Sequence, residues 1–352
     1  MIQSLTSLRF LFILLIVLFH IVGERFEFGG DCGVTFFLML SGFVLSYAYG
    51  QRVLDGQFRT CSFIKKQFVK FYPLHLLMLV VMVLLEARLE RYYEWYQLLP
   101  SVLLIQSWFP FDSIIQVGNA SSWFLCAIVF GYAVFAMVFR FIHRVSPKYL
   151  MVMIVAVLML YGGVVSGVPM NKLNYIVCLS PLLRVLDFCI GILVWRFCMS
   201  LRGEAFGRHL QTWSAWQVTL LELMPVALVG ASFFVYGSIS PRLRCVSMFW
   251  LVLPFLLYVY VKTDKLQGWV TWLLHRPLML WLGGISMEIY LTHWPVMRVF
   301  QSLLHLMGQY DRLPAVGVLS LTMIPIVLAA YAFQRCYVQP VQRKLSFYIS
   351  SK

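Results

Sequence analysis

Long apolar segments alternate with short polar ones along the whole chain. Each apolar segment is long enough to cross a hydrocarbon core of about 30 Å as a helix, and the pattern predicts ten spans. Their approximate bounds are 8–23, 33–49, 71–87, 121–140, 149–166, 175–196, 217–236, 245–261, 280–303 and 314–335. We therefore expect an all-α integral membrane protein with about ten transmembrane helices in one bundle.

A further apolar segment near 97–110 differs from the spans. It is short, contains prolines and is rich in aromatic side chains, which favours an extra interfacial or re-entrant helix. No connecting loop is long enough to form a separate soluble domain. We therefore expect one membrane domain over residues 1–340 and a cytoplasmic tail at 341–352, with any chemistry taking place in or at the membrane.

Composition and charge agree with this picture. Hydrophobic residues make up 61% of the 352 and charged residues 12%, whereas a soluble domain carries about 25% charged residues. The net charge of +14 lies mainly in alternate loops, as the positive-inside rule requires, and an even number of spans places both termini in the cytoplasm. The charge is thus a topology signal, and we expect no nucleic-acid partner. The loop "SPRLRC" is the exception, because this topology places its arginines outside.

The cysteines and the small residues of the spans are most simply packing residues. The eight cysteines are scattered and lack the paired spacing of a disulfide framework or a zinc site, and we expect no bound metal. In the second span, Ser41 and Gly42 lie among large aromatic side chains, where small residues let membrane helices approach closely. A packing role is therefore the default for both.

The first span carries ionisable residues that a purely apolar helix would not need. Arg9 and His20 are eleven residues apart, roughly 16 Å along a helix axis, which suits a long ligand with an anionic head at Arg9 and a reactive end at His20. Arg9 alone is equally well explained as a snorkelling topology anchor. His20 favours function, because histidine is the natural general base at neutral pH. Glu24, one turn later, either orients the imidazole or is an ordinary acid at the helix end.

A basic run, "FIKKQFVKFYPLH", leads into the third span. Its residues Lys65, Lys66 and Lys70 lie on the same expected cytoplasmic side as Arg9. They either attract anionic lipid headgroups or form a phosphate-binding rim for an anionic donor, and the two roles are compatible.

Two later spans also contain ionisable residues. Arg184 and Asp187 are three residues apart, so they share a helix face, either as a structural ion pair or as part of a polar cavity. Glu288 and His293 lie in the ninth predicted span with Tyr290 between them. Their spacing of five is poor for direct contact, so we expect them to face different partners.

Five segments together resemble one family. They are "SLRFLFILLIVLFH", "GVTFFLMLSGFVLS", "KKQFVKFYPLH", "PLLRVLDFCIGIL" and "ISMEIYLTHWPV". In this order they resemble the signatures of the membrane-bound acyltransferase-3 family, the O-acyltransferases that modify cell-envelope glycans, over most of the chain.

The resemblance implies a cytoplasmic acyl-CoA donor, usually acetyl-CoA, and an acceptor hydroxyl on a glycan or glycolipid at the outer face of a bacterial inner membrane. His20 would be the catalytic histidine, acting as general base or as transient acyl carrier, and Arg9 would help to bind the donor. The full set of catalytic candidates is His20, Glu24, Asp187, Glu288 and His293. The full set of donor-binding candidates is Arg9, Lys65, Lys66, Lys70 and Arg184.

The chain departs from the family pattern at two places. Its basic run offers lysines where many members have arginines, so bidentate phosphate contacts would be lost. Many members also carry an acidic residue shortly after a Trp-x-Leu motif, where this chain has Cys126, Ala127 and Ile128. If that acid matters in relatives, we expect Asp187 or Glu288 to replace it.

Two other classes of function stay open from the residues alone. A non-enzymatic transporter or flippase of a glycan precursor would also need polar groups in the membrane, but it would not need a histidine and an arginine on one helix. The absence of an internal repeat weakens that alternative. A structural partner of an envelope-assembly complex would leave His20 and His293 unexplained.

Overall fold

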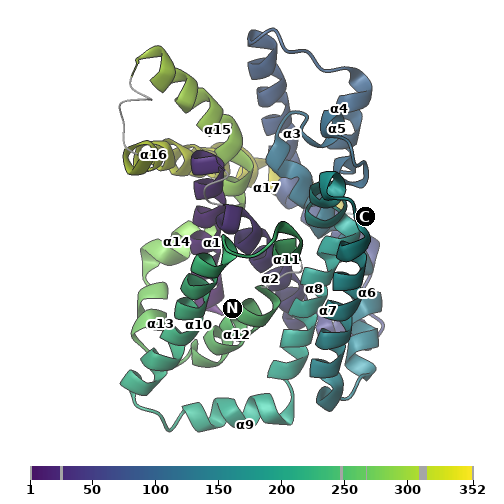
Figure 1. The fold of residues 1–352 in the computed structure, drawn as a ribbon, viewed down its shortest axis with the longest axis vertical. Helices are drawn as coiled ribbons and strands as arrows, with labels where there is room; N and C mark the ends of the chain where they lie inside the picture. Colours follow the sequence, from purple (N-terminus) through teal and green to yellow (C-terminus); the bar gives the residue numbers. More distant parts are fainter. Residues whose placement is uncertain (1, 24–26, 246–248, 267, 309–314, 351–352) are drawn as a thin grey trace. The chain divides into compact units, whose positions relative to one another are not determined.

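The computed structural model describes residues 2–23, 27–245, 249–266, 268–308 and 315–350, which form helices and turns with no β-strand (Figure 1). The α-helices are α1 Gln3–Val22, α2 Glu27–Leu54, α3 Thr60–Arg88, α4 Trp95–Val102, α5 Asp112–Ile115, α6 Trp123–Arg144, α7 Leu150–Gly167, α8 Pro181–Cys198, α9 Leu201–Leu210, α10 Ala215–Tyr236, α11 Pro241–Cys245, α12 Phe249–Thr263, α13 Trp269–Leu274, α14 Pro277–Gly284, α15 Ser286–Leu306, α16 Ala315–Phe333 and α17 Gln339–Ser350. Short 3-10 or π turns between them are η2 Gln106–Trp108, η3 Ala120–Ser122, η4 Pro147–Tyr149, η5 Met170–Lys172, η6 Asn174–Cys178 and η8 Gln334–Val338. The expected all-α fold is confirmed.

The number of long apolar helices is lower than the ten predicted spans. Seven described helices are long and apolar enough to cross a membrane, or eight if Val152–Gly167 and Met170–Cys178, which meet at a bend of 116°, form one span. The counterparts of the predicted spans 175–196 and 280–303 are α8 and α15, whose polar and charged side chains lower their hydropathy. The cytoplasmic placement of both termini stays a prediction.

Between α3 and α6 the chain forms short helical pieces rather than a span, as the sequence near 97–110 predicts. Inside a bilayer such irregular backbone is tolerated only where the protein itself provides its hydrogen-bond partners. At the end of α4, the carbonyl of Val102 accepts a hydrogen bond of 2.8 Å from the hydroxyl of Tyr72. The carbonyl of Ser101 accepts one of 2.9 Å from Nε2 of the fully buried His75. Helix α3 therefore supports this segment.

The chain divides into two compact units. Unit 1 comprises Met1–Phe12, Cys32–Phe58 and Ala127–Gly284, and unit 2 comprises Ile13–Asp31, Arg59–Cys126 and Ile285–Lys352. Helices α1, α2 and α6 contribute residues to both units.

In unit 1, helices α2 and α8 pack with their backbones in contact. A Cβ atom added to Gly42 would lie 2.0 Å from the carbonyl oxygen of Phe188, and one added to Gly191 would lie 1.9 Å from that of Met39. The two glycines therefore lie opposite the partner backbone, in the way that small residues allow membrane helices to approach. The packing role predicted for Gly42 agrees with this geometry.

The first turn of α1 is fixed to the segments around α13 and α14 within unit 1. The carboxylate of Asp264 accepts a hydrogen bond of 2.8 Å from the backbone N–H of Ser4 and lies 3.0 Å from Nε2 of His275. A Cβ atom on Gly283 would lie 1.9 Å from the carbonyl oxygen of Thr6, so α14 packs directly on the α1 backbone. A carboxylate at a helix N-terminus interacts favourably with the helix dipole, which stabilises the start of α1.

The basic loop "SPRLRC" has a structural explanation. Arg242 donates hydrogen bonds of 2.6 and 3.0 Å to the carbonyls of Val165 and Ser166 in the last turn of α7. Arg244 donates one of 3.2 Å to the carbonyl of Gly237, just after α10. Cations are stabilised at helix C-termini, where carbonyls lack intrahelical partners. These arginines therefore donate hydrogen bonds to carbonyls at the C-termini of helices, and they also add positive charge to the loop.

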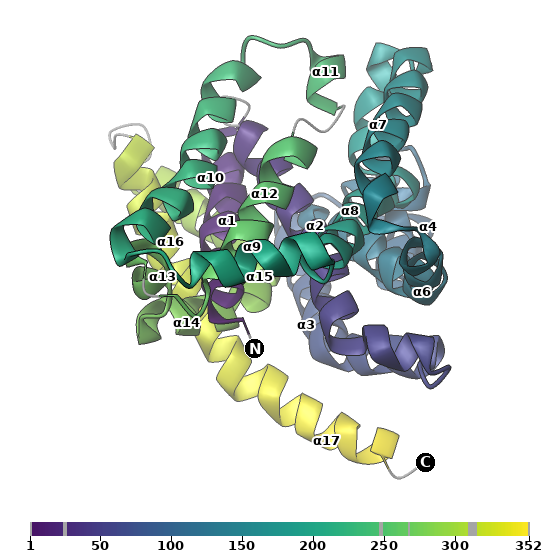
Figure 2. The same ribbon diagram turned by 90° about the horizontal axis from the view of Figure 1, so that it is seen from below.

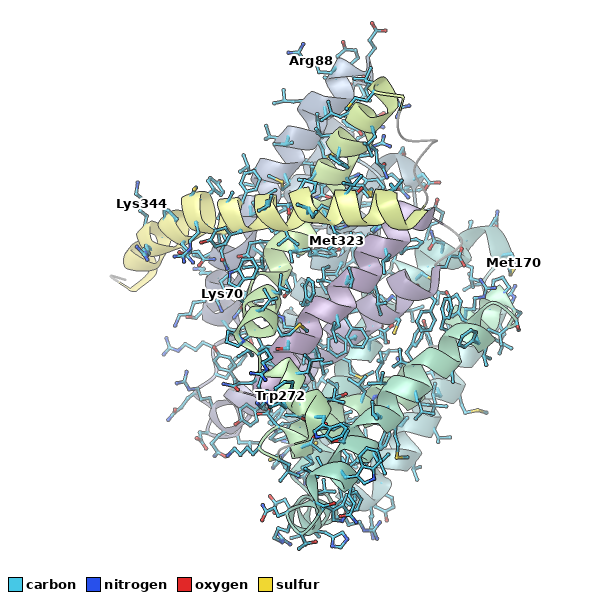
Figure 3. All side chains as sticks on the ribbon, turned by 90° about the vertical axis from the view of Figure 1, so that its left-hand side faces the viewer. Lys70, Arg88, Met170, Trp272, Met323 and Lys344 are labelled. Atoms are coloured by element: carbon cyan, nitrogen blue, oxygen red, sulfur yellow. The ribbon has the colours of Figure 1, made fainter. Side chains whose placement is uncertain are left out.

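In unit 2, α15 packs against α3 and α16, and α17 contacts α3 and leads to the C-terminus (Figure 2). The side chain of Gln342 donates a hydrogen bond of 3.0 Å to the carbonyl of Lys70, and the hydroxyl of Tyr337 donates one of 3.4 Å to that of Pro73. Figure 3 labels Lys70 on α3 and Lys344 on α17. Most of the predicted tail at 341–352 is thus helical.

Gly191→Ala is expected to destabilise the fold, because the new methyl group would meet the α2 backbone. Overpacking of this kind costs about 1–3 kcal/mol, so the thermal unfolding midpoint Tm in detergent should fall. Gly162→Ala is the matched control, because a Cβ atom there meets nothing within 4 Å and should leave Tm unchanged. Equal Tm values for the two variants would contradict the close packing of α2 and α8.

Candidate active site

Two histidines that are far apart in the sequence face each other in unit 2. His20 lies in the last turn of α1 and is half-buried, and its ring centroid is 5.1 Å from that of His293 on α15, with an angle of 31° between the rings. The indole of Trp294 meets His20 edge-on at 5.0 Å. The His-Trp pair of "YLTHWPV" therefore lies against the histidine of the first helix.

The hydrogen bonding of His293 leaves one ring nitrogen available. Its Nδ1 atom is 2.5 Å from the carbonyl oxygen of Tyr290, and since a carbonyl only accepts, Nδ1 carries the hydrogen and Nε2 keeps its lone pair. His293 is fully buried, and its Nε2 has no hydrogen-bond partner among the residues that the structure describes. A buried nitrogen of this kind is costly to leave unsatisfied. It is thus suited to accept a proton from a substrate.

Glu288 lies on the same helix as His293 but on a different face. It is 9% exposed, and five residues place its side chain roughly 140° around the axis from His293. Its backbone carbonyl accepts a hydrogen bond of 2.8 Å from the hydroxyl of Thr292. This geometry agrees with the expectation that Glu288 and His293 face different partners.

Near the position where many family members are expected to carry an acid, this chain has neutral side chains that form a hydrogen-bond network. The thiol of Cys126 donates a hydrogen bond of 3.1 Å to Oε1 of Gln106, and Nε2 of that amide donates one of 3.0 Å to the hydroxyl of Ser122. All three residues are buried in unit 2. Sequence reasoning did not single out Gln106, because an isolated glutamine in a segment of short helices resembles an ordinary turn residue.

In unit 1, Arg184 and Asp187 form the ion pair that their spacing predicts. Their closest N–O distance is 3.1 Å, and both residues are buried. Arg184 also donates hydrogen bonds to the carbonyl of Cys178 at 2.6 Å and to the hydroxyl of Thr35 at 3.2 Å. Asp187 accepts one of 2.5 Å from the indole N–H of Trp250. A pair so enclosed by protein partners favours the structural alternative.

The predicted donor-binding residues lie on three different helices, and Arg184 is on α8. Arg9 is half-buried on α1, the same unbroken helix that carries His20. In unit 2, Lys65, Lys66 and Lys70 are exposed in the first part of α3. Glu24 lies outside the described residues.

One buried acid that sequence reasoning missed is Glu222 in α10. It is fully buried, and its carboxylate accepts hydrogen bonds of 3.1 and 3.2 Å from the backbone N–H groups of Val270 and Thr271 at the start of α13. The sequence does contain a signal for Glu222, because a lone acidic residue inside an apolar span is unusual. Its contacts indicate a structural role. In the described part of the chain, no group of three His, Cys, Asp or Glu side chains could hold a metal ion.

Comparison with known proteins gives a consistent result. The Acyl_transf_3 family, described as an acyltransferase domain, matches residues 2–334. "Acyltransferase MdmB" of Streptomyces mycarofaciens is 28% identical over 362 aligned positions, which cover 93% of this chain and 88% of that protein. "Protein 2 in picA locus" of Rhizobium radiobacter is 40% identical over 68 residues, covering 18% of this chain and 35% of that protein. No solved structure matches significantly.

Asp187→Ala is expected to lower the stability of unit 1 sharply. Removing one partner of a buried ion pair leaves the other charge uncompensated, at about 3–5 kcal/mol, so Tm in detergent should fall by many degrees. Adding Arg184→Leu to Asp187→Ala should restore part of this loss, because the unpaired charge is then gone. A double variant no more stable than Asp187→Ala would show that the pair is not what stabilises this region.

Proposed function

The chain belongs to the acyltransferase-3 family, and from this premise we propose that it moves an acyl group from cytoplasmic acyl-CoA to a hydroxyl of a cell-surface or lipid-linked glycan. Acetyl is the proposed acyl group. The chain is a multi-pass membrane acyltransferase, and the proposed location is the inner membrane of a bacterium. Family membership in an enzyme class also disfavours a non-enzymatic transporter or flippase.

The observation that carries the proposal is the apposition of His20 and His293. O-acyl transfer needs a group that accepts the proton of the acceptor hydroxyl as its oxygen becomes a nucleophile. The lone pair on Nε2 of His293 and the half-buried imidazole of His20 are two such groups, 5.1 Å apart between ring centroids. Trp294, in contact with His20, helps to exclude water from the reacting atoms.

Two chemical routes fit this pair. In the direct route, an imidazole nitrogen takes the hydroxyl proton while the oxygen attacks the thioester carbonyl; the C–S bond breaks and the CoA thiolate takes the proton. In the covalent route, a nitrogen of His20 bonds to the acyl carbon as the C–S bond breaks and the CoA thiolate leaves. The acceptor oxygen then attacks that carbon as the C–N bond breaks, and the hydroxyl proton passes through an imidazole to the thiolate. A second imidazole beside His20 serves either route, because it can take the hydroxyl proton when His20 carries the acyl group and can relay that proton when His20 is the base.

The donor is proposed to bind through its phosphates. The exposed Lys65, Lys66 and Lys70 on α3 supply point charges to a phosphate, although they lack the bidentate geometry of arginine. Arg9 supplies a guanidinium on the same helix as His20. The same lysines also suit anionic lipid headgroups, so membrane lipids are expected neighbours of this surface.

His20→Ala is expected to abolish release of free CoA from acetyl-CoA by the detergent-purified protein. Loss of a general base lowers kcat by about 100- to 10,000-fold. Arg9→Ala should mainly raise the KM for acetyl-CoA, because it removes binding to a part of the donor remote from the reacting carbonyl. His209→Ala, an exposed histidine on α9, is the matched control and should retain wild-type turnover.

One outcome would overturn the proposed function. If the folded wild type neither binds nor consumes any acyl-CoA in the presence of candidate glycan acceptors, then this chain does not carry out acyl transfer from CoA. Transport of a labelled lipid-linked sugar by the same preparation would then favour the transporter alternative.

A further inference from the structure

Helix α15 contains a proline in the segment that carries the candidate histidine. Pro295 has no backbone N–H, so the carbonyl four residues earlier, that of Leu291, loses its helical partner. The hydroxyl of Thr292 also bonds back to the carbonyl of Glu288 at 2.8 Å, a contact that often bends helices. His293 lies between Leu291 and Pro295, so its direction depends on how this turn is stabilised.

Asn119, just before η3, provides the missing donor. Its Nδ2 atom donates a hydrogen bond of 2.9 Å to the carbonyl oxygen of Leu291. Its Oδ1 atom accepts one of 2.8 Å from the hydroxyl of Ser121, which orients the amide so that the NH₂ group faces α15. The side chain of Asn119 is fully buried, so no water competes for this carbonyl.

A second contact ties the same turn to the same segment. The hydroxyl of Tyr290 donates a hydrogen bond to the backbone carbonyl of Ser121, and the Tyr290 carbonyl in turn accepts the Nδ1 hydrogen of His293. The segment around η3 therefore contacts α15 at Tyr290 and Leu291, the residues immediately before His293. All of these residues belong to unit 2.

We propose that Asn119 is a positioning residue for acyl transfer: by bonding the carbonyl that Pro295 leaves unpaired, its amide fixes the turn of α15 that holds His293 beside His20. This inference rests on the proposed function, because it assumes that the two histidines react with substrate. Asn119 touches neither histidine directly through any hydrogen bond of the described residues, and it acts through the backbone of α15.

Asn119→Ala tests the inference by its effect on kcat. A displacement of a catalytic group by about 1 Å lowers the rate by about 100-fold, so kcat for acetyl-CoA turnover should fall by 10- to 100-fold while KM for acetyl-CoA changes less than about twofold. Ser122→Ala is the matched control, because it removes a buried hydrogen bond to Gln106 in the same segment and leaves the hydrogen bonds of Asn119 and Tyr290 to their partners in place. It should keep kcat.

A double-mutant cycle separates positioning from general weakening of the fold. If Asn119 acts through His293, Asn119→Ala should lower kcat no further in a His293→Ala background. If Asn119→Ala lowers kcat equally in both backgrounds, or no more than Ser122→Ala does, the inference is wrong and Asn119 contributes to stability only.

Pro295→Ala gives the converse test. It returns a backbone N–H to the carbonyl of Leu291, so Asn119→Ala combined with Pro295→Ala should recover the Tm lost in Asn119→Ala. It should not recover kcat, because a turn held by its own helical hydrogen bond instead of by Asn119 directs His293 differently. Recovery of wild-type kcat by the double variant would overturn the inference.

A readout without turnover distinguishes failure of this inference from failure of the proposed function. Diethyl pyrocarbonate modifies histidine nitrogens, and mass spectrometry reports the modified fraction at each histidine. The fully buried His293 should react slowly in the wild type and in Ser122→Ala, and several-fold faster in Asn119→Ala. Faster modification of His293 in Asn119→Ala, in an enzyme that does not consume acyl-CoA, would support the positioning role and reject the proposed function. Unchanged modification of His293 in an enzyme that does consume acyl-CoA would reject the positioning role and leave the proposed function standing.

Discussion

The interaction on which the site depends is the hydrogen bonding of backbone carbonyls that lie inside an apolar protein without a helical partner. In a bilayer, water does not satisfy such groups, so side chains from other elements must do so. Asn119 provides such a contact for the Leu291 carbonyl of α15, and Tyr290 of α15 provides one for the Ser121 carbonyl. Tyr72 and His75 provide them for the end of α4. These polar side chains of unit 2 therefore pair with backbone carbonyls of other segments.

The same requirement explains which ionisable residues are structural and which are available for chemistry. Asp264, Glu222 and the Arg184–Asp187 pair all bond to protein partners. His293 differs, because one ring nitrogen is bonded to the helix and the other has no hydrogen-bond partner among the described residues. A buried polar atom without a protein partner is the exception in folded proteins, and one of those among the described residues lies beside the histidine of the first helix.

Much of the fold follows from the apolar pattern, because long apolar segments satisfy their own backbone only as helices. The predicted spans 33–49 and 71–87 lie within α2 and α3. The count of ten spans stays a prediction, because polar and charged side chains lower the hydropathy of α8 and α15 below that of the other predicted spans. The ion pair of α8 was predictable because both partners lie on one helix face.

The contact between His20 and His293 was not predictable, because it depends on how segments that are distant in the sequence pack together. The spacing of residues within one segment does not indicate such a contact. Asn119 was missed for a related reason. In a segment with glycine and serine, an asparagine is typical of a turn. Its hydrogen bond can be recognised only in the structure, where Pro295 on another helix leaves a carbonyl without a helical partner. The hydrogen bond between Cys126, after the Trp-x-Leu motif, and Gln106 was likewise not indicated by any pattern along the chain. The expectation that Asp187 or Glu288 replaces the acid of relatives stays a prediction.

The central claim is that His20 and His293 form one reacting centre. The most direct measurement is kcat for release of CoA from acetyl-CoA, with acceptor present, by the wild type, His20→Ala, His293→Ala and the double variant. The account predicts that each single substitution lowers kcat by at least about 100-fold and that the double variant is no slower than the slower single variant, as for residues that act as a unit. Wild-type kcat in His293→Ala, or losses that multiply in the double variant, would contradict it.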